Sequence, residues 1–329
     1  MMFRKILFKI LNTKVFPLRT LAISSNHDTI LITGGSNGLG LALVKNFLAA
    51  GFKVIVLDIV KPPIDTYKYN NSITHRSNLI YVEFDLSDVN NFKNLPKYLS
   101  LHNIQKGEIK VIINNAGIIN GKCLSEIKTE MIEKTILVNY ESAILLILSL
   151  DEYMCKDPST LIVSVASVLG LITPPKLTLY GASKKALIRF HSFLNELQLI
   201  NSPLKSLLIL PGQIDTGMFN GVKTPNNLLA PVLEADCLAQ NIFSTIVNYE
   251  ESLNETVWKT NMFNNKGKVY YAPFYVGLVP IFKNLPFSIV NNIRKFSGMD
   301  QAMNGYIPIG KTIKTNQKLI ELCFMEPIN

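Results

Sequence analysis

The chain has 329 residues, of which 48% are hydrophobic and 17% charged, so it can bury a large core and is not a disordered chain. Its formal net charge of +9 is concentrated at the two ends: residues 1–27 hold five Lys or Arg and no acid, residues 28–258 carry −2, and residues 259–329 carry +6. A nearly neutral middle argues against a nucleic-acid-binding body, and basic, apolar ends fit an anionic membrane surface better.

Residues 1–27 form a basic leader ahead of the fold. Five apolar residues recur on one face of a predicted helix, and the basic residues lie off this face. The apolar residues are Phe3, Ile6, Leu7, Ile10 and Leu11. No apolar run approaches the ~20 residues that cross a bilayer. The leader is interpreted as a mitochondrial presequence, a helix lying on a membrane surface, or a disordered segment, and composition does not separate the first two.

From residue 28 to about residue 273, short β-branched runs alternate with helical patterns. Strands are predicted at residues 29–33, 53–58, 79–84, 110–113, 160–165, 206–210 and 268–271. Helices are predicted between them, including residues 38–50, 127–154, 181–199 and 234–249. Strands that are apolar throughout and separated by helices indicate one doubly wound (Rossmann) α/β domain, with a mostly parallel sheet of about seven strands. Residues 274–329 follow as a helical, apolar and basic extension.

A glycine-rich loop, Thr33-Gly-Gly-Ser-Asn-Gly-Leu-Gly40, joins the first strand to the first helix. Gly34, Gly38 and Gly40 would let the backbone turn tightly and approach a pyrophosphate seated on the helix N-terminus. The other loop residues counted as cofactor contacts are Ser36, Asn37 and Leu39. The loop therefore predicts a dinucleotide site.

Acidic residues follow the second and third strands. Asp58 lies eighteen residues after Gly40, where a carboxylate accepts hydrogen bonds from a ribose diol and repels a 2′-phosphate. It favours NAD over NADP as cofactor, although the nearby Lys61 weakens that preference. Asp85 is predicted to meet the adenine edge, with a loop or helix-capping role as the alternative.

Further motifs follow the later strands in order. Tyr180 and Lys184 lie one helical turn apart, and Ser167 lies thirteen residues before Tyr180. The remaining motifs are Asn114-Asn-Ala-Gly117, Asn139 in the long helix, and Pro211-Gly212 with Thr216 soon after. Together these residues resemble the short-chain dehydrogenase/reductase family over about residues 28–250.

The resemblance implies a reaction in which hydride moves between a cofactor and a carbonyl or alcohol carbon, with Tyr180 exchanging the proton. A free tyrosine has a pKa of about 10, and Lys184 beside it is expected to favour the phenolate. By resemblance, Ser167 orients the substrate oxygen, Lys184 also holds the nicotinamide ribose, and Asn139 supports a water chain. The remaining positions that the resemblance assigns to the cofactor are Asn114, Gly117 and Thr216, the last at the carboxamide.

The aromatic and apolar residues 263–296 resemble the C-terminal region of membrane-associated members, the retinol and 17β-hydroxysteroid dehydrogenase-like proteins that act on lipids. A lipophilic alcohol, or its ketone or aldehyde, is therefore the predicted substrate, with a plain C-terminal core helix as the alternative reading of this segment. One rival function is an NADPH-dependent reductase of a lipid-biosynthetic ketone, against which Asp58 argues. Another is a nucleotide-binding scaffold that has lost its chemistry, although all three reactive side chains are present.

Four scattered cysteines show no metal-ligand spacing, which indicates reduced thiols in a reducing intracellular compartment and predicts no metal site. The helices in residues 124–154 and 181–199 are expected, by resemblance, to pair in a homodimer or tetramer. We expect peripheral association with the endoplasmic reticulum or a lipid droplet, or a mitochondrial location, and no nucleic-acid partner.

Overall fold

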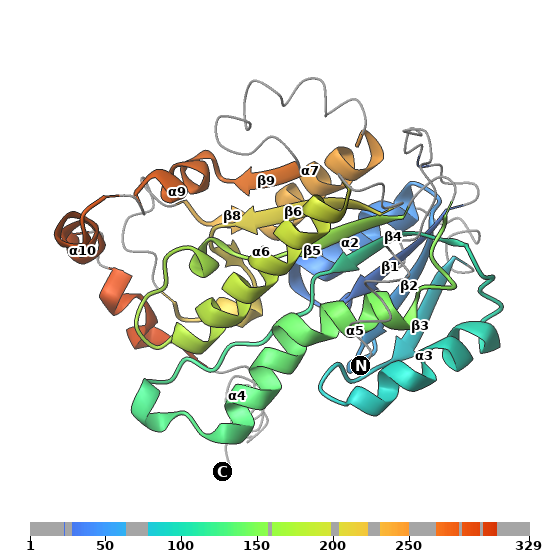
Figure 1. Cartoon of the computed structure of the whole chain (residues 1–329), viewed down its shortest axis with the longest axis horizontal. Helices are drawn as coiled ribbons and strands as arrows, with labels where there is room; N and C mark the ends of the chain where they lie inside the picture. Colours follow the sequence, from blue (N-terminus) through green and yellow to red (C-terminus); the bar gives the residue numbers. More distant parts are fainter. Residues whose placement is uncertain are drawn as a thin grey trace, which may run out of the picture.

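The computed structural model describes residues 23, 28–63, 78–156, 160–198, 204–222, 231–249, 268–282, 285–296 and 299–307. Nearly all of the leader, and the tail beyond residue 307, lie outside the described residues. Seven parallel strands form one sheet in the order β3-β2-β1-β4-β5-β6-β9 (Figure 1). The strands are β1 Thr29–Thr33, β2 Lys53–Asp58, β3 Leu79–Glu83, β4 Ile109–Asn114, β5 Leu161–Val165, β6 Lys205–Pro211 and β9 Lys268–Ala272. The predicted fold class is confirmed.

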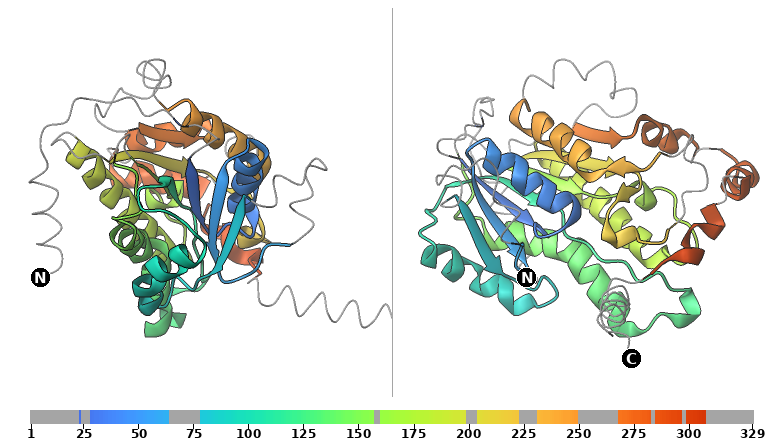
Figure 2. Two further views of the ribbon diagram at one scale, coloured as in Figure 1. Left: turned by 90° about the vertical axis from the view of Figure 1, so that its right-hand side faces the viewer. Right: turned by 180° about the vertical axis from the view of Figure 1, so that it is seen from behind.

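Helices cover both faces of the sheet (Figure 2). One face packs against α2 Gly38–Ala49 and α7 Ala235–Val247. The other packs against α3 Val89–Leu101, α5 Ser142–Ser149 and α6 Thr178–Gln198. The shorter elements are α4 Thr129–Ile136, the 3₁₀ helices η5 Val168–Gly170 and η6 Gly217–Phe219, and the two-residue strands β7 Ile214–Asp215 and β8 Leu233–Glu234. None of the described helices has the length and apolarity needed to span a bilayer.

The strand sequences explain why the sheet is buried on both sides. All five residues of β1 are buried, and successive side chains enter opposite cores. Ile30 and Ile32 pack with α2 and α7, whereas Leu31 packs on the α3 and α5 side. Because the strands are parallel, their carboxyl ends share one edge of the sheet, and the residues that follow them meet there.

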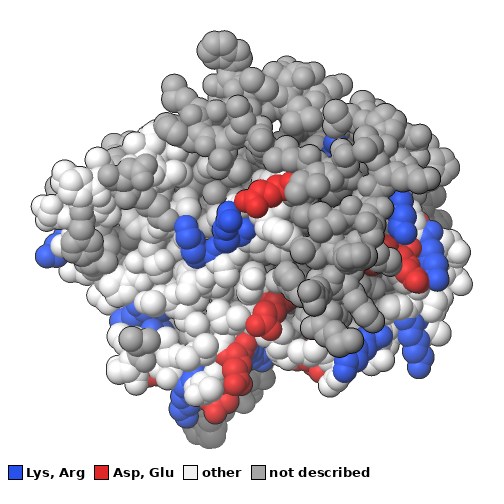
Figure 3. Space-filling model, viewed as in Figure 1, with Lys and Arg blue, Asp and Glu red and all other residues white. Residues whose placement is uncertain are grey.

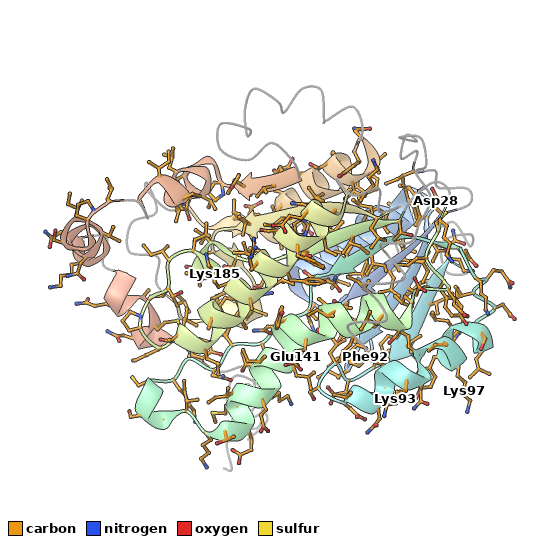
Figure 4. The ribbon with its side chains drawn as sticks, viewed as in Figure 1. Asp28, Phe92, Lys93, Lys97, Glu141 and Lys185 are labelled. Carbon is orange, nitrogen blue, oxygen red and sulfur yellow. The ribbon has the colours of Figure 1, made fainter. Side chains whose placement is uncertain are left out.

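The long helix predicted at residues 127–154 is interrupted. Residues 137–141 form a π-helical turn, η4 Leu137–Glu141, between α4 and α5, and Glu141 marks its end in Figure 4. The turn places Asn139 inward with only 2% of its surface exposed. Single π-turns of this kind recur at functional sites. After α5 ends at Ser149, the chain turns and forms an isolated bridge between Met154 and Ile109.

The last described elements lie beyond β9, on the side toward which its arrowhead points in Figure 1. They are η7 Phe274–Leu278, α9 Val279–Phe282, α10 Phe287–Phe296 and η8 Met299–Gly305. Since the carboxyl ends of the strands face the same way, this C-terminal part of the chain lies near the edge of the sheet where the predicted site residues meet.

Candidate active site

The glycine loop is fastened to the segment that follows β4. The Thr33 hydroxyl accepts hydrogen bonds from the backbone N–H groups of Asn115 and Ala116, both at 3.1 Å. The Asn115 side-chain amide donates to the carbonyl oxygens of Thr33 (3.0 Å) and Gly34 (3.1 Å). Asn115 was not among the predicted site residues, although its place beside Asn114 in the motif was the available signal. These bonds fix the loops after β1 and β4 against each other.

Close packing inside this loop requires the absence of side chains at two positions. A Cβ atom on Gly40 would lie 2.0 Å from the Gly34 carbonyl oxygen and 2.5 Å from Asn115 Nδ2. Gly38 has a φ of +53°, and a Cβ there would lie 3.0 Å from Thr216 Cγ2. The predicted contact residues Gly34, Gly38, Gly40 and Thr216 are therefore brought together at the start of α2.

Asp58 ties the end of β2 to the glycine loop. Its carboxylate accepts hydrogen bonds from the backbone N–H of Ser36 (2.9 Å) and of Val60 (3.2 Å), and the Ser36 hydroxyl donates to the Val60 carbonyl oxygen (2.5 Å). The next side chains, Ile59 and Val60, are 62% and 50% exposed. An acid followed by two exposed apolar residues thus borders the glycine loop. The predicted contact residues Asn37 and Leu39 lie at the other end of this loop, at the start of α2.

Asp85 has a local structural role in the described residues. Burial would raise the pKa of its carboxyl, but hydrogen bonds from the Ser87 hydroxyl (2.7 Å) and backbone N–H (2.8 Å) hold that pKa below its ordinary value. The Asp85 carbonyl oxygen also accepts from Asn91 Nδ2 at 3.1 Å. The geometry matches the loop-acid alternative, and the adenine contact stays a prediction.

Asn114 and Gly117 lie between the loop and the reactive residues. The Asn114 side chain is 6% exposed, and its Nδ2 atom has no hydrogen-bond partner among the described residues. A Cβ on Gly117 would lie 3.4 Å from Lys184 Nζ and 3.5 Å from Asn139 Oδ1. The glycine therefore leaves the space in front of the lysine open.

The structure gathers the four predicted catalytic residues. Helix α6 begins at Thr178, three residues earlier than predicted, so that Tyr180 lies within its first turn. The Lys184 ammonium nitrogen lies 5.8 Å from the Tyr180 ring centroid and donates to the Val165 carbonyl oxygen at 2.9 Å. Ser167, at the start of η5, hydrogen-bonds to Tyr180 through its side chain and accepts from the Leu169 N–H at 3.1 Å.

Asn139 holds three parts of this site together. Its Nδ2 donates to the Ile118 carbonyl oxygen and to Ser183 Oγ, both at 3.0 Å, and its Oδ1 accepts from the Ile118 N–H at 2.8 Å. The Ser183 hydroxyl in turn donates to the Tyr180 carbonyl oxygen at 2.7 Å. Both amide hydrogens of Asn139 are thus used within the protein. Ser183, inside the Tyr180–Lys184 motif, was not among the predicted site residues.

Burial dominates the acid–base properties of the pair. Desolvation raises the pKa of Tyr180 to about 12, and the hydrogen bond with Ser167 offsets only part of this increase. Desolvation also lowers the pKa of Lys184 to about 8. Lys184 is not among the causes of the Tyr180 shift, since its ammonium is directed at the Val165 carbonyl, and the expected stabilisation of the phenolate by Lys184 stays a prediction.

Ser164 of β5 has a structural contact with α6. Its hydroxyl lies 3.3 Å from Nδ1 of His191, a fully buried residue of α6. Desolvation lowers the pKa of His191 to about 3, so this imidazole is neutral near pH 7. The pair packs between β5 and α6, one residue before the carbonyl that binds Lys184.

Apolar side chains surround Tyr180 on its other side. Its ring meets Phe219 edge-on, with centroids 6.2 Å apart, and packs with Leu177 and Met303. Around these residues lie Ile119, Leu169, Val222 and Tyr306. A cavity of about 410 Å³, lined by residues 213–217, 219–222 and Val232, opens beside Phe219 and Thr216. Met303 and Tyr306 were not predicted individually, because their sequence separation from Tyr180 gives no local signal.

Contacts at its C-terminal end fasten the segment 299–307 over this cluster. A Cβ on Gly121 would collide with the Tyr306 ring, 2.2 Å from its Cδ1 atom. The Ile307 N–H donates to the Asn220 carbonyl oxygen at 3.0 Å, and Lys176 Nζ donates to Asn304 Oδ1 at 3.3 Å. The C-terminal segment therefore covers one side of the apolar cluster around Tyr180.

Replacing Gly40 with alanine should prevent cofactor binding, because the new methyl group would collide with the backbone oxygen of Gly34. We expect affinity for NADH to fall at least tenfold, ~1.4 kcal/mol or more, in a fluorescence titration. Gly277→Ala is the matched control, since a Cβ there makes only ordinary contacts, the nearest 3.7 Å from the Tyr271 ring. Equal NADH affinity in the two variants would contradict the role of the loop.

Replacing Lys184 with methionine should stabilise the protein at neutral pH. The folded-state pKa of about 8 lies below the ordinary 10.5, so the buried ammonium destabilises the fold below pH 8, and this cost disappears as pH rises from 8 to 10.5. After subtracting the lost hydrogen bond to Val165, we expect a gain of about 2 kcal/mol in the free energy of unfolding at pH 7.

The gain from Lys184→Met should vanish near pH 10.5, as measured by urea unfolding across this range. Lys185→Met, at the exposed neighbouring position, is the control and should change little at any pH. Ionisation of Tyr180 above pH 10 affects the parent and both variants alike. A Lys184→Met protein less stable than its parent at pH 7 would contradict the interpretation.

Comparisons with known proteins agree with this geometry. The family model for short chain dehydrogenase matches residues 28–227. Uncharacterized oxidoreductase YDL114W of Saccharomyces cerevisiae is 36% identical over 287 residues, which cover 85% of this chain and 84% of the relative. Human (Homo sapiens) retinol dehydrogenase 10 is 28% identical over 228 residues, covering 67% of this chain and 62% of that protein.

Solved structures show the same architecture. A 4-hydroxyisoleucine dehydrogenase complexed with NADH superimposes with a TM-score of 0.59 at 26% identity, covering 74% of this chain and 96% of that one. A short chain dehydrogenase from Burkholderia cenocepacia in complex with NADP has a TM-score of 0.60 at 18% identity, covering 82% of this chain and 98% of that one, and shows the fold alone. The chain therefore belongs to the short-chain dehydrogenase/reductase family of oxidoreductases and has its NAD(P)-binding fold.

Proposed function

We propose that the protein interconverts a lipophilic alcohol and its ketone or aldehyde, with NAD(H) as the preferred cofactor and Ser167, Tyr180, Lys184 and Asn139 as the catalytic group. The observation that carries the proposal is the position of Tyr180. Its hydroxyl is bonded to Ser167 and its ring lies beside Lys184, while Phe219, Met303 and other apolar side chains form the surrounding wall.

The residues at the carboxyl edge of the sheet fit a nicotinamide dinucleotide. Gly34, Gly38 and Gly40 leave a backbone cradle at the start of α2, where N–H groups favour a pyrophosphate. The buried Asn114 Nδ2 is a donor without a partner among the described residues, and Gly117 leaves the approach to Lys184 open. Thr216 borders the same space. A bound nicotinamide ring would supply or accept the hydride.

The protein's own part in the reaction is to place the substrate oxygen and move one proton. Tyr180 donates its hydroxyl proton to that oxygen during reduction and takes it back during oxidation. Ser167 Oγ donates a hydrogen bond to the same oxygen and orients it. Near neutral pH, Lys184 is largely protonated and provides the positive charge that stabilises the phenolate once substrate excludes the remaining water. Asn139 fixes the backbone that carries Tyr180.

NAD(H) is favoured over NADP(H) by the residues at the end of β2. The Asp58 carboxylate lies against the glycine loop through its bond to the Ser36 N–H, where it would accept from ribose hydroxyls and repel a 2′-phosphate. Ile59 and Val60 follow it and offer no cation to a phosphate. Lys61 is exposed and weakens this preference for NAD(H) over NADP(H).

The substrate class rests on the apolar cluster around Tyr180. Leu177, Phe219 and Met303 pack around Tyr180. An apolar substrate that covers these side chains would be stabilised by ~25 cal/mol for each Å² of apolar surface buried. Relatives of this chain include proteins named retinol dehydrogenase 10 and 17-beta-hydroxysteroid dehydrogenase 13. Those names are consistent with a hydrophobic alcohol as substrate.

The cofactor preference is tested by fluorescence titration with NADH and NADPH. We expect the wild-type protein to bind NADH at least tenfold more tightly, and Asp58→Asn to lose most of this difference because the repulsion of the 2′-phosphate is removed. Asp85→Asn is the matched control, since that carboxylate bonds to its own loop, and should keep the preference. Tighter NADPH binding by the wild-type protein would instead favour the alternative, a reductase of a lipid-biosynthetic ketone.

The reaction is tested by following NADH formation with a series of alcohols of increasing chain length. We expect kcat/KM to rise about fourfold per added methylene, the value of ~0.8 kcal/mol for burying one such group, until the pocket is filled. Tyr180→Phe should abolish turnover with every alcohol while binding NADH as tightly as the parent. Substantial turnover by Tyr180→Phe would refute the assigned proton transfer, and a flat chain-length series would refute the lipophilic substrate.

A further inference from the structure

The C-terminal elements η7, α9 and α10 carry a run of exposed aliphatic side chains. Leu278, Ile281 and Ile289 are each 45% exposed, and Leu285 is 36% exposed. We call these four residues the aliphatic ridge. Leu278, Ile281 and Ile289 come from η7, α9 and α10, and Leu285 lies between α9 and α10. These elements lie at one end of the molecule in Figure 1. Large apolar residues that gather on adjoining surface elements mark interaction sites more often than single ones do.

The charge of this segment has one sign. Residues 274–296, which span these elements, contain three basic residues and no acidic one. Lys295 is exposed at the end of α10, and the charged atoms that Figure 3 shows over this helix are basic. Ile132 on α4 is a contrasting exposed aliphatic residue, since it is 44% exposed and lies between Glu130 and Glu133 in the sequence.

The opposite side of the same elements is anchored in the protein. Val276 of η7 is fully buried in a cluster with Leu208 and Leu210 of β6. Helix α10 contacts η8, whose Met303 packs against Tyr180. The aliphatic ridge is therefore carried on elements that pack on the sheet and adjoin the apolar cluster around Tyr180.

We infer that the aliphatic ridge binds the surface of an anionic lipid bilayer. Aliphatic side chains enter the headgroup boundary, while neighbouring cations contact anionic headgroups, and a segment without acids avoids repulsion from them. An apolar partner surface would gain nothing from the absence of acids over the 23 residues 274–296, whereas a negatively charged surface would avoid repulsion. The short helices do not cross the membrane, so the interaction is peripheral. The bound orientation places the segment 299–307, which covers the apolar cluster around Tyr180, near the lipid.

The inference is tested with the purified full-length protein by co-sedimentation with vesicles of phosphatidylcholine, with and without phosphatidylserine. The test variant is Ile281→Asp/Leu285→Asp, and the matched control is Leu101→Asp/Ile132→Asp, which adds the same charge at exposed aliphatic positions of α3 and α4. We expect wild-type binding to vesicles with phosphatidylserine, weakened by salt, and at least tenfold weaker binding by the test variant.

The control variant should bind vesicles as the wild-type protein does, and all three proteins should keep their NADH affinity, which reports an intact fold independently of any substrate. Equal vesicle binding by the test variant would overturn the inference and assign any binding to the leader or another surface. If the test variant loses self-association in light scattering while vesicle binding is unchanged, the ridge contacts a second copy of the chain and the inference is overturned.

Discussion

The active site depends on the bonds that join the loops after β1 and β4. Thr33 and Asn115 exchange four hydrogen bonds across this junction with each other and their neighbours, and the Gly40 backbone fits beneath them without room for a methyl group. On one side of the junction lies the glycine cradle with Asp58. On the other lie Asn114 and Gly117, which lead to Lys184. A rigid crossing point therefore sets the distance between the cofactor side of the site and the proton-transfer side.

Desolvation shifts the pKa values of the reactive side chains and also lowers the stability of the fold. Tyr180 and Lys184 are almost completely buried, and burial shifts the pKa of each toward its neutral form. The fold holds an ammonium that would be better solvated outside, because β5 offers the Val165 carbonyl and α6 is fixed by packing along its length. Such unfavourable burial is typical of catalytic groups, whose reactivity comes with a loss of stability.

The sheet was predictable because its strands are short β-branched runs with buried residues on both faces, and each predicted strand end lies within one residue of the observed one. The order of the motifs was enough to predict the four residues that the structure gathers around Tyr180. The π-turn at residues 137–141 was not predictable, because an uninterrupted apolar helix and one with a single wide turn have the same periodicity. The contacts of Met303 and Tyr306 were missed for another reason: each depends on tertiary packing between residues far apart in sequence. Asn115 differs, because its place beside Asn114 in the motif was a local signal.

The wall formed by residues 299–307 has an evolutionary consequence. It shares no backbone with the segments that hold the cofactor and the proton-transfer residues, and it meets Tyr180 only through side chains such as Met303. Substitutions in this stretch can reshape the room available to a substrate without disturbing hydride chemistry. Enzymes descended from one ancestor can therefore diverge in substrate specificity while they keep the same reaction, through changes in a few residues near the end of the chain.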